Sequence, residues 1–469
     1  MQLLDTIAAV STPYGKGGVA MLRVSGGEAI TIASRIFCPM NGKPLAETPV
    51  RTAVYGHILA PEADGSLQPV DDGIATVFTA PASFTGENTV EICCHGGILM
   101  TQTVLSALLT AGARAAEPGE FTRRAFLNGK MGLDAAEALG SLLEAENRSQ
   151  LTLAFGGMHG TLEARGQEIY TRLRGVMSAV LANIDFPDED LADMSRGEMC
   201  EQVSACERAL RALADTYRTG HAVAEGVVTA ICGRTNVGKS SLYNRLVGRE
   251  AAIVTDIAGT TRDVLSERVS LGRVTLRLSD TAGLREASDR VEQIGIERAR
   301  RAMDEAELIL AVFDVSAPLN EEEHRLLTTL SDYVARGIAV LPILNKCDTN
   351  TPCIQTEETV EQTLGTPIRL SVATGQGLDA LIDRVEALFV DGSIDMRNDA
   401  VVVNARQYAS VLRALESVAR AREGLESGLP LDLCCVDVEC AMSELSRMDG
   451  RAVDEDIVSE IFSHFCVGK

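Results

Sequence analysis

One short segment in the middle of the 469-residue chain, GRTNVGKS (233–240), constrains the fold more than any other feature of the sequence. It has the spacing G-x-x-x-x-G-K-S, follows the apolar run VVTAIC and precedes the helix-like run SLYNRLVG. The two glycines allow the backbone to wrap around a diphosphate, so that successive N–H groups point inward. The segment therefore predicts a phosphate-binding loop between a strand and a helix, with Lys239 at the β and γ oxygens and Ser240 as a ligand of Mg²⁺.

Further segments extend this nucleotide site in the expected order. The run DTAG (280–283) ends the apolar stretch VTLRLS, where Asp280 can hold Mg²⁺ through water and the amide of Gly283 can contact a γ-phosphate. The run NKCD (345–348) ends the stretch AVLPIL, and the Asp348 carboxylate can accept from the two N–H groups that guanine presents and adenine does not. Such a site typically rejects the mismatched base by roughly 10⁴-fold, because its carboxylate would stay unpaired. The nucleotide is therefore expected to be GTP, with Ser371, Val372 and Ala373 closing over the base.

The loop TDIAGTTRD (255–263) lies between these segments and is expected to respond to the nucleotide. A threonine in this loop can complete the Mg²⁺ shell only while a γ-phosphate is present, and Thr261 is our choice for it. Leu284 follows DTAG directly, and an apolar side chain cannot orient the attacking water. Glu286 is the nearest acid that could do so, and a solvated surface acid is the alternative for that residue.

The rest of the chain divides by its patterns. Short β-rich runs with Gly and Pro turns fill residues 1–130, helical periodicity fills 131–220, strands alternate with helices over 221–390, and helical spacing returns over 391–469, where Tyr408, Leu412, Leu415 and Ala419 share one face. We expect a multidomain α/β and α protein. It would consist of an N-terminal α+β domain, a discontinuous helical bundle, and an inserted GTPase domain with a doubly wound, mostly parallel sheet.

Composition narrows the function classes. The chain has 43 Lys and Arg against 66 Asp and Glu, for a formal net charge of −23, so diffuse electrostatic binding to nucleic acid is not expected and any RNA contact must be local. No apolar run of about 18 residues occurs, and the N-terminus lacks a basic signal-peptide region, so we expect a cytoplasmic protein with no membrane span. The 12 cysteines include no C-x-x-C pair, and most are expected to be buried, inert thiols.

Together with these motifs, the segments GKGGVAMLRVSG, SFTGEN, HGG, EPGEFTRRAFLNGK and the terminal FCVGK make the chain resemble the MnmE/TrmE family of tRNA modification GTPases along its whole length. The resemblance implies a GTPase that works with a flavoprotein of the MnmG type. Together they install an aminomethyl or carboxymethylaminomethyl group at carbon 5 of the wobble uridine in certain tRNAs. It also implies a homodimer through the N-terminal domain, transient dimerisation of the GTPase domains, and a heterotetramer with the FAD-containing partner.

The resemblance assigns ligands residue by residue. K⁺ would take the place of an arginine finger, held by Asn236, Thr255, Ile257 and Thr260, while Glu286 would orient the water. The departure SVATGQG, where the family usually has SARTGEG, puts side-chain help at the guanine in doubt but not the backbone contact. The full set of contacts expected for GTP or GDP is Asn236, Val237, Gly238, Lys239, Ser240, Ser241, Thr255, Asp256, Ile257, Ala258, Gly259, Thr260, Thr261, Asp280, Thr281, Ala282, Gly283, Asn345, Lys346, Asp348, Ser371, Val372 and Ala373.

The resemblance also implies a folate site in the N-terminal domain. Arg23, Glu91 and Lys130, with the C-terminal Lys469, match the positions that bind a 5-formyl-tetrahydrofolate-type cofactor. Cys466 could act there as a nucleophile or proton donor, although a packing cysteine is the alternative. The competing class is a GTPase that only docks to ribosomal RNA or to an assembly factor and catalyses no modification. It would predict an appended basic module such as a KH domain, which the acidic, helical C-terminal region does not resemble.

Overall fold

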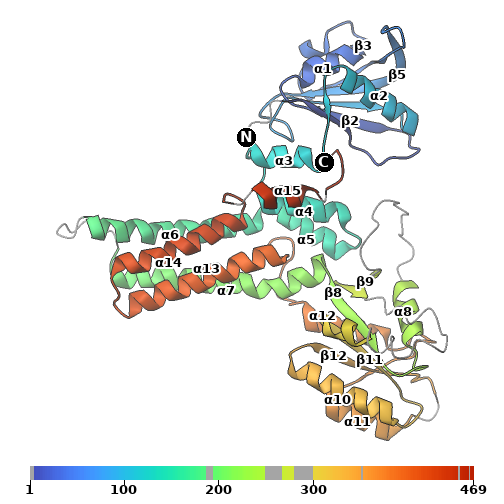
Figure 1. Ribbon diagram of the computed structural model, residues 1–469, viewed down its shortest axis with the longest axis vertical. Helices are drawn as coiled ribbons and strands as arrows, with labels where there is room; N and C mark the ends of the chain where they lie inside the picture. The colour runs from blue at the N-terminus through green and yellow to red at the C-terminus, as the bar shows by residue number, and fades with distance from the viewer. Residues whose placement is uncertain are drawn as a thin grey trace. The chain divides into compact units, whose positions relative to one another are not determined.

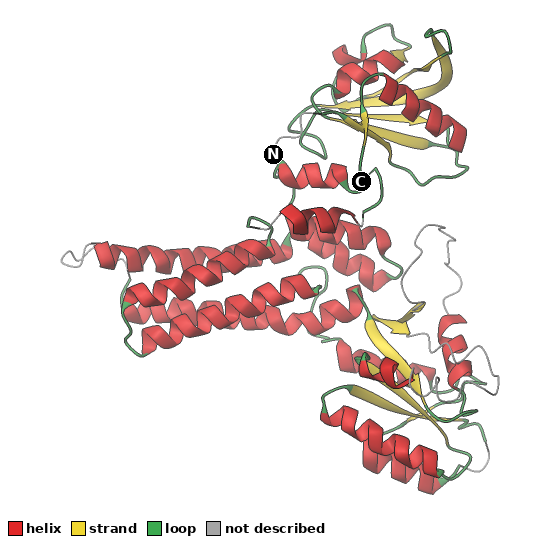
Figure 2. Ribbon diagram, in the orientation of Figure 1, coloured by secondary structure: helices red, strands yellow, loops and turns green. Residues whose placement is uncertain are grey.

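The computed structural model describes residues 5–185, 194–248, 267–278, 299–349, 352–452, 455–463 and 465–468. Contacts divide the chain into two compact units, one of residues 1–143, 158–167 and 443–469 and the other of residues 144–157 and 168–442. Each unit contains one β-sheet together with helices (Figures 1 and 2). No helix among the described residues combines the length and the apolar character needed to cross a bilayer.

The first unit is built on a seven-stranded sheet in the order β3-β4-β5-β6-β2-β1-β7. Its pairs are antiparallel except for β1 with β7. Two helices cover one face, where Ile32 and Leu108 are buried in one core with Leu22 of the sheet. The elements are β1 (Ile7–Val10), β2 (Ala20–Ser25), α1 (Ala29–Ile36), β3 (Phe37–Pro39), β4 (Ala53–Pro61), β5 (Leu67–Phe78), β6 (Thr89–Cys94), α2 (Ile98–Thr110) and β7 (Arg114–Ala115), with a 3₁₀ turn at Leu45–Glu47.

The first unit also joins both ends of the chain. Helices α3 (Glu120–Leu127), α4 (Leu133–Glu144) and α15 (Glu455–Ser463) share a small core in which the rings of Phe126 and Phe462 lie 6.3 Å apart. After α15, Val467 forms an isolated antiparallel bridge with Pro118. The last described residues are therefore part of the N-terminal fold, although they follow it by more than 300 positions in the sequence.

The second unit contains a six-stranded sheet in the order β13-β12-β11-β8-β10-β9. Every pair is parallel except β10 with β9. Apolar cores cover both faces, one including α8 and α12 and the other α10 and α11, so the doubly wound, mostly parallel sheet expected for this region is confirmed. The elements are β8 (Val227–Cys232), α8 (Lys239–Gly248), β9 (Glu267–Leu271), β10 (Val274–Leu278), β11 (Leu308–Asp314), α10 (Glu321–Ala335), β12 (Ala339–Asn345), α11 (Ile354–Leu364), β13 (Ile368–Arg369) and α12 (Leu378–Phe389).

Long helices complete the second unit. Ser195 and Glu198 form a capping box that starts α7, and Asn404 caps α13. The two helices are tied by the stacked rings of Tyr217 and Tyr408, whose centroids are 4.0 Å apart. The helices are α5 (Arg148–Met158), α6 (Thr161–Asp185), α7 (Arg196–Ala224), α13 (Ala405–Glu426) and α14 (Leu431–Met448), of which α6 up to Gln167 and α14 from Ser443 fall in the first unit.

One sequence-based expectation is wrong and another is confirmed. Only four of the 12 cysteines are buried, five are half-buried and Cys38, Cys440 and Cys466 are exposed, because many lie on helix or loop surfaces rather than in cores. The helix expected from the spacing is confirmed as α13, and Tyr408, Leu412, Leu415 and Ala419 are all half-buried along one face of it. The buried residues next to this face are Gln407, Val411, Ala414 and Val418.

Candidate functional site

The phosphate loop has a backbone that only glycine allows at two positions. Gly233 has φ +142°, and a Cβ there would lie 2.2 Å from the carbonyl oxygen of Val312. Gly238 has φ +107°, and a Cβ there would lie 2.2 Å from Nδ2 of Asn345. Helix α8 begins at Lys239, directly after the second glycine, so its first N–H groups are available to an anion. The loop fits a bound phosphate chain.

Lys239 closes this loop on itself. Its Nζ donates to the carbonyl oxygens of Gly233 and Arg234, at 2.7 Å each. Burial lowers the pKa of Lys239, and a phosphate beside it would favour the charged ammonium. Ser240 is half-buried and Ser241 exposed in the first turn of α8, while Asn236 is exposed in the loop with φ +64°.

Asn345 joins the two halves of the site. It ends β12 and is only 4% exposed, its Nδ2 donates to the carbonyl oxygen of Val237 at 2.7 Å, and its Oδ1 accepts from the backbone N–H of Val372 at 3.1 Å. One side chain therefore links the phosphate loop to the loop expected at the base, with both of its polar atoms used.

The base side is built on the residues that follow β12 and β13. Lys346 has φ +64°, and its Nζ lies 2.5 Å from Oδ2 of Asp314. Burial alone would raise the pKa of Asp314, but hydrogen bonds from Lys346 and Ser316 outweigh it and the pKa is lowered. Asp348 is exposed and open to a ligand. Ser371 is fully buried with its Oγ accepting from the N–H of Thr374 at 3.2 Å, whereas Ala373 is exposed.

Sequence reasoning missed two side chains that support this site. Asp314 is the only charge in the apolar run that forms β11, which is the signal that could have revealed it. Arg234 lies with its Nε 3.6 Å from Oε1 of Glu323, a 2% exposed carboxylate that also completes the capping box of α10 with Asn320. No local pattern links residues 89 positions apart, so this contact could not be read from the sequence.

Part of the expected site falls outside the described residues. This holds for the loop assigned to Mg²⁺ and K⁺, for DTAG, for the water-orienting acid and for the last lysine. Across the described part of the chain, no three His, Cys, Asp or Glu side chains are grouped to hold a metal ion. The expected site residues outside the described ranges are Thr255, Asp256, Ile257, Ala258, Gly259, Thr260, Thr261, Asp280, Thr281, Ala282, Gly283, Glu286 and Lys469.

In the first unit, Arg23 and Glu91 face each other across the strand pair β2–β6. Nε and Nη2 of Arg23 donate to Oε1 of Glu91 at 3.0 and 2.7 Å. The Arg23 guanidinium also lies 5.2 Å from the ring centre of Phe84 and 5.7 Å from that of Phe121. Both hydrogen bonds end on one carboxylate oxygen, so Oε2 of Glu91 remains an acceptor for the amino edge of a heterocycle.

Lys130 belongs to the same region through the loop of residues 81–88. Its Nζ donates to the carbonyl oxygen of Pro81 at 2.9 Å, and its stem covers Gly86. Phe84 of the same loop stacks on Arg23. The structure therefore brings Arg23, Glu91 and Lys130 around one loop, an arrangement that fits a ligand with a flat ring and a carboxylate tail.

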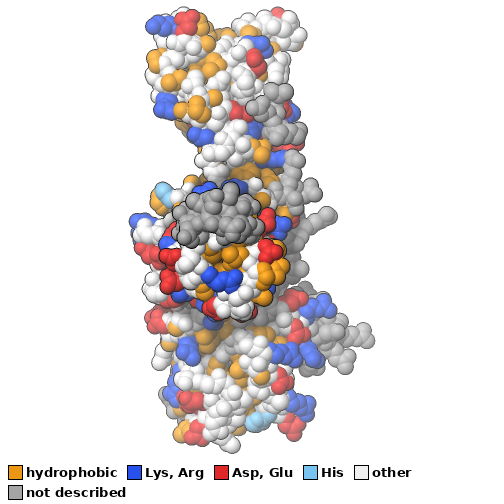
Figure 3. All heavy atoms as spheres, turned by 90° about the vertical axis from the view of Figure 1, so that its left-hand side faces the viewer, with side chains coloured by type: hydrophobic (Ala, Val, Ile, Leu, Met, Phe, Trp, Pro, Cys, Tyr) orange, Lys and Arg blue, Asp and Glu red, His pale blue; other side chains and the backbone are white. Residues whose placement is uncertain are grey.

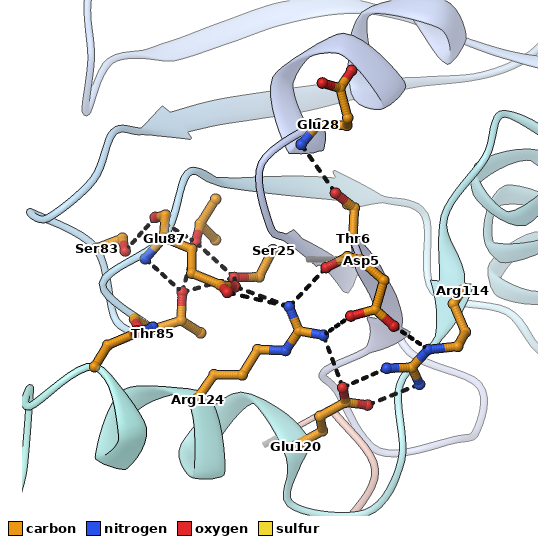
Figure 4. Close-up of polar contacts among 12 residues, drawn as sticks. Asp5, Thr6, Ser25, Glu28, Ser83, Thr85, Glu87, Arg114, Glu120 and Arg124 are labelled. Atoms are coloured by element: carbon orange, nitrogen blue, oxygen red, sulfur yellow. Dashed lines mark hydrogen bonds and ion pairs between the residues drawn. The ribbon is translucent and has the colours of Figure 1, made fainter. Parts of the chain in front are cut away.

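An ionic cluster centred on the buried Arg124, here called the Arg124 cluster, holds this region together (Figure 4). Arg124 is 1% exposed, and its Nη2 donates to Oδ1 of Asp5 at 2.8 Å and to Oε1 of Glu120 at 2.9 Å. Its Nη1 donates to the carbonyl oxygen of Asp5 at 2.8 Å and to Glu87 at 3.2 Å. Arg114 reaches the same carboxylates, with Nε 2.7 Å from Oδ2 of Asp5. The cluster ties α3 to β1 and to the loop around Glu87.

The C-terminal segment lies against the same fold. The Oγ of Ser11 donates to the carbonyl oxygen of Gly468 at 3.1 Å, and the N–H of Gly119 donates to that of Cys466 at 3.4 Å. Gly468 has φ +96°, and a Cβ there would lie 2.3 Å from the carbonyl oxygen of Val10. The thiol of Cys466 is exposed.

Comparisons with known proteins agree with this organisation. The family model described as GTP-binding protein TrmE N-terminus matches residues 6–130, and the one described as MnmE helical domain matches residues 133–466. The tRNA modification GTPase MnmE of Bacillus subtilis (strain 168) is 40% identical over 468 residues, covering 99% of this chain and 100% of that protein. The protein of the same name from Lacticaseibacillus paracasei is 39% identical over 468 residues, covering 99% and 98%.

Solved structures give weaker likenesses. Aquifex aeolicus Era Y63A bound to GDP·AlF4⁻ has 20% identity and a TM-score of 0.27, with 40% of this chain and 65% of that chain covered. A GTP-binding protein from Sulfolobus solfataricus in complex with GDP has 14% identity and a TM-score of 0.25, with 61% and 76% covered. At these scores the likenesses add nothing to the fold described above.

Proposed function

The chain belongs to the MnmE family of tRNA modification GTPases, and we propose that it is a potassium-dependent member that modifies carbon 5 of the wobble uridine in certain tRNAs. The added group is aminomethyl or carboxymethylaminomethyl, the partner is an MnmG-type flavoprotein in a heterotetramer, and the one-carbon donor is a tetrahydrofolate derivative. The observation that carries the proposal is the Asn345 bridge between the phosphate loop and the base loop, in a chain that aligns with these relatives from end to end.

For GTP, the phosphate loop and the Asn345 contacts support the proposed roles of the described residues, and the roles of the other residues are proposed from the sequence motifs. The loop 233–240 and Lys239 hold the phosphates, Ser240 and Thr261 bind Mg²⁺, and Asp348 selects guanine. Val237, Gly238, Ser241, Lys346, Ser371, Val372 and Ala373 line the nucleotide, together with Asp256, Ala258, Gly259, Asp280, Thr281, Ala282 and Gly283 of the loops outside the described residues.

Potassium dependence is proposed for Asn236 with Thr255, Ile257 and Thr260. Asn236 supports this assignment because its left-handed backbone and exposed side chain present an amide oxygen at the surface of the phosphate loop. K⁺, when bound, supplies a fixed positive charge where negative charge develops during phosphoryl transfer. Glu286 orients the attacking water.

We propose that residues 1–130 form a folate-binding and dimerising domain. Residues 131–220 and 391–469 form the two parts of a helical domain, and residues 221–390 form the GTPase domain inserted between them. Arg23, Glu91, Lys130 and Lys469 bind the 5-formyl-tetrahydrofolate-type cofactor, and Cys466 acts on the uridine. The face drawn in Figure 3 carries basic and acidic side chains next to one another. Together with the net charge of −23, this favours local contacts with tRNA.

The test separates GTP hydrolysis from modification in a strain that lacks the native protein and carries wild type, Glu286→Ala or Cys466→Ser. Glu286→Ala should bind GTP almost normally but turn it over roughly 10²-fold more slowly. Cys466→Ser should show near-normal turnover and no modified wobble uridine on nucleoside analysis. Unchanged wobble uridine in the strain without any copy would contradict the proposal and favour a GTPase that only docks to RNA.

Potassium dependence is tested on the purified wild-type protein. GTP turnover should be much faster in K⁺ than in Na⁺ at equal ionic strength, and Asn236→Ala should remove the difference. Equal rates in the two salts for the wild type would overturn the potassium assignment alone.

A further inference from the structure

A buried hydroxyl group connects the strand pair β9–β10 to two helices of the second unit. Thr275 of β10 is 1% exposed. Its Oγ1 accepts from Nδ2 of Asn147 at 3.2 Å and from Nε2 of Gln150 at 3.1 Å, and it donates to the carbonyl oxygen of Val223 at 3.4 Å. The hydroxyl thus donates one hydrogen bond and accepts two, which is the largest number it can form. Strand β10, the start of α5 and the end of α7 therefore meet at one fully used group.

The two amides are held in one orientation. Oδ1 of Asn147 caps α5 by accepting from the N–H of Gln150 at 3.0 Å, so its Nδ2 must point to the strands, where it also donates to Oγ of Ser270 at 2.8 Å. Oε1 of Gln150 accepts from the N–H of Glu146 at 2.9 Å, which turns its Nε2 toward Thr275. Gln150 is 6% exposed, so an unmade hydrogen bond here would not be replaced by water.

The strand pair β9–β10 lies in the sequence between the two loops proposed to bind the Mg²⁺ and γ-phosphate end of GTP. Ser270 of β9 and Thr275 of β10 are register partners. Asn147 donates to both side chains and Gln150 donates to Thr275, so both strands are bonded to the start of α5. β9 begins six residues after Thr261, and β10 ends two residues before Asp280, the two positions proposed above at the Mg²⁺ and γ-phosphate end of the site. A shift of the strand pair would move both connections together.

The helical side of the contact is equally tight. Gly226, between α7 and β8, has φ +89°, and a Cβ there would lie 3.0 Å from the carbonyl oxygen of Thr275. Leu153 of α5 is buried in the same core as Val223 and Leu276. One turn further along α5, a Cβ at Gly156 would lie 2.7 Å from the carbonyl oxygen of Met396. α5 therefore cannot slide on the strand pair without breaking these contacts.

From this geometry we propose that Asn147 and Gln150 are positioning residues that transmit the position of β9–β10, and with it the nucleotide state, to helices α5 and α7. The inference rests on the proposed function, because it concerns how GTP hydrolysis is coupled to tRNA modification. The amides touch neither GTP nor tRNA. Their effect is on the amount of modification obtained for each GTP hydrolysed.

Two variants break the contact in different ways. Thr275→Val removes the hydroxyl at nearly constant volume, and Asn147→Asp keeps the cap of α5 while removing the donor. Both should keep guanine-nucleotide affinity and GTP turnover within about twofold of wild type, while wobble-uridine modification per GTP hydrolysed falls about tenfold, which is within the usual range of coupling between sites.

Matched controls separate coupling from stability. Thr275→Ser keeps the hydroxyl and should keep the ratio. Thr229→Val removes another fully buried hydroxyl from the same sheet, one that donates only to Val227 of its own strand, and should also keep the ratio. The inference is overturned if the ratio is unchanged in both Thr275→Val and Asn147→Asp, or if it falls equally in Thr229→Val. A wild type that hydrolyses GTP but leaves uridine unmodified would overturn the proposed function as well.

Discussion

The phosphate loop of the second unit and the Arg124 cluster of the first unit are both polar, but backbone conformation shapes the first and side-chain charge shapes the second. In the loop, backbone conformations at Gly233 and Gly238 do the positioning, and Lys239 donates to carbonyl oxygens only a few residues away. In the cluster, side-chain charges do the positioning, and Arg124 reaches Asp5 across 119 positions. A single added carbon should therefore damage the loop, whereas the cluster should be sensitive to a removed charge.

The largest effect is expected from Gly238→Ala. The added Cβ would meet Nδ2 of Asn345 at 2.2 Å on a backbone with φ +107°, so the loop and the Asn345 bridge could not both persist. GTP affinity should fall by about 10³-fold, or about 4 kcal/mol, by equilibrium binding. The control is Gly248→Ala, at the end of α8, where nothing lies within 4 Å of the new Cβ. Equal binding by the two variants would mean that the backbone does not shape the site.

Next in size is Arg124→Met. Removing the guanidinium leaves Glu120, which is 5% exposed, with one arginine fewer, and Glu87 with none. Glu120 keeps the hydrogen bonds from Arg114 and Glu87 keeps the one from Ser25, so losing the charge-assisted hydrogen bonds of Arg124 should cost about 2–3 kcal/mol, measured as the free energy of unfolding of the first unit in denaturant. Lys43→Met, at an exposed position of the same unit, should change it by about 0.5 kcal/mol or less. A matching small change in Arg124→Met would make the cluster dispensable.

These two regions also show where sequence reasoning succeeds. The phosphate loop and NKCD could be predicted because their chemistry depends on neighbouring residues in a fixed spacing. The apolar runs before the phosphate loop, DTAG and NKCD correspond to strands β8, β10 and β12 of the structure. The strands expected to alternate with helices over 221–390 also show the limit, because β13 consists only of Ile368–Arg369.

The Arg124 cluster could not have been predicted in this way. Two adjacent arginines occur in EFTRRAFL, and nothing local distinguishes the one that meets Asp5 and Glu87. The same holds for the buried face of α13, where Gln407 and Ser410 are buried through contacts with distant helices. Long-range pairing of polar groups leaves no period in the sequence, so only the fold reveals it.

A smaller effect is expected from Gly468→Ala, which applies the backbone test to the first unit. The Cβ would meet the carbonyl oxygen of Val10 at 2.3 Å, so the segment carrying Cys466 would shift. Wobble-uridine modification should fall about tenfold while GTP turnover stays within about twofold, because the two sites are proposed to lie in different domains. Gly27→Ala, with nothing within 4 Å of its Cβ, is the control. Full modification by Gly468→Ala would show that the position of the segment is unimportant.

The smallest effect is expected at the junction of α7 and β8. Here His221 lies between two carboxylates, so side-chain charge acts in the second unit as it does in the Arg124 cluster of the first. Nδ1 of His221 lies 3.2 Å from Glu225 and Nε2 lies 3.3 Å from Glu307. The nearby carboxylates of Glu225 and then Glu307 raise the pKa of His221 from its ordinary 6.5 to about 9. Since the pKa is raised on folding, the stabilisation is fully present below pH 6.5 and is lost as the pH rises through about 9.

At about 1.4 kcal/mol for each tenfold change in proton affinity, this shift would be worth about 3 kcal/mol, but both glutamates are more than two-fifths exposed, so screening reduces it to about 1–2 kcal/mol. His221→Gln should therefore be less stable than wild type by that amount at pH 6 and equally stable at pH 9.5, in unfolding titrations of the second unit's transition. His324→Gln, at an exposed position of α10, should run parallel to wild type over the same range. Parallel curves for His221→Gln would show that uncharged contacts of α7 hold it in place without help from His221. One such contact is the hydrogen bond that Thr219 Oγ1 donates to the Phe389 carbonyl oxygen at 3.3 Å.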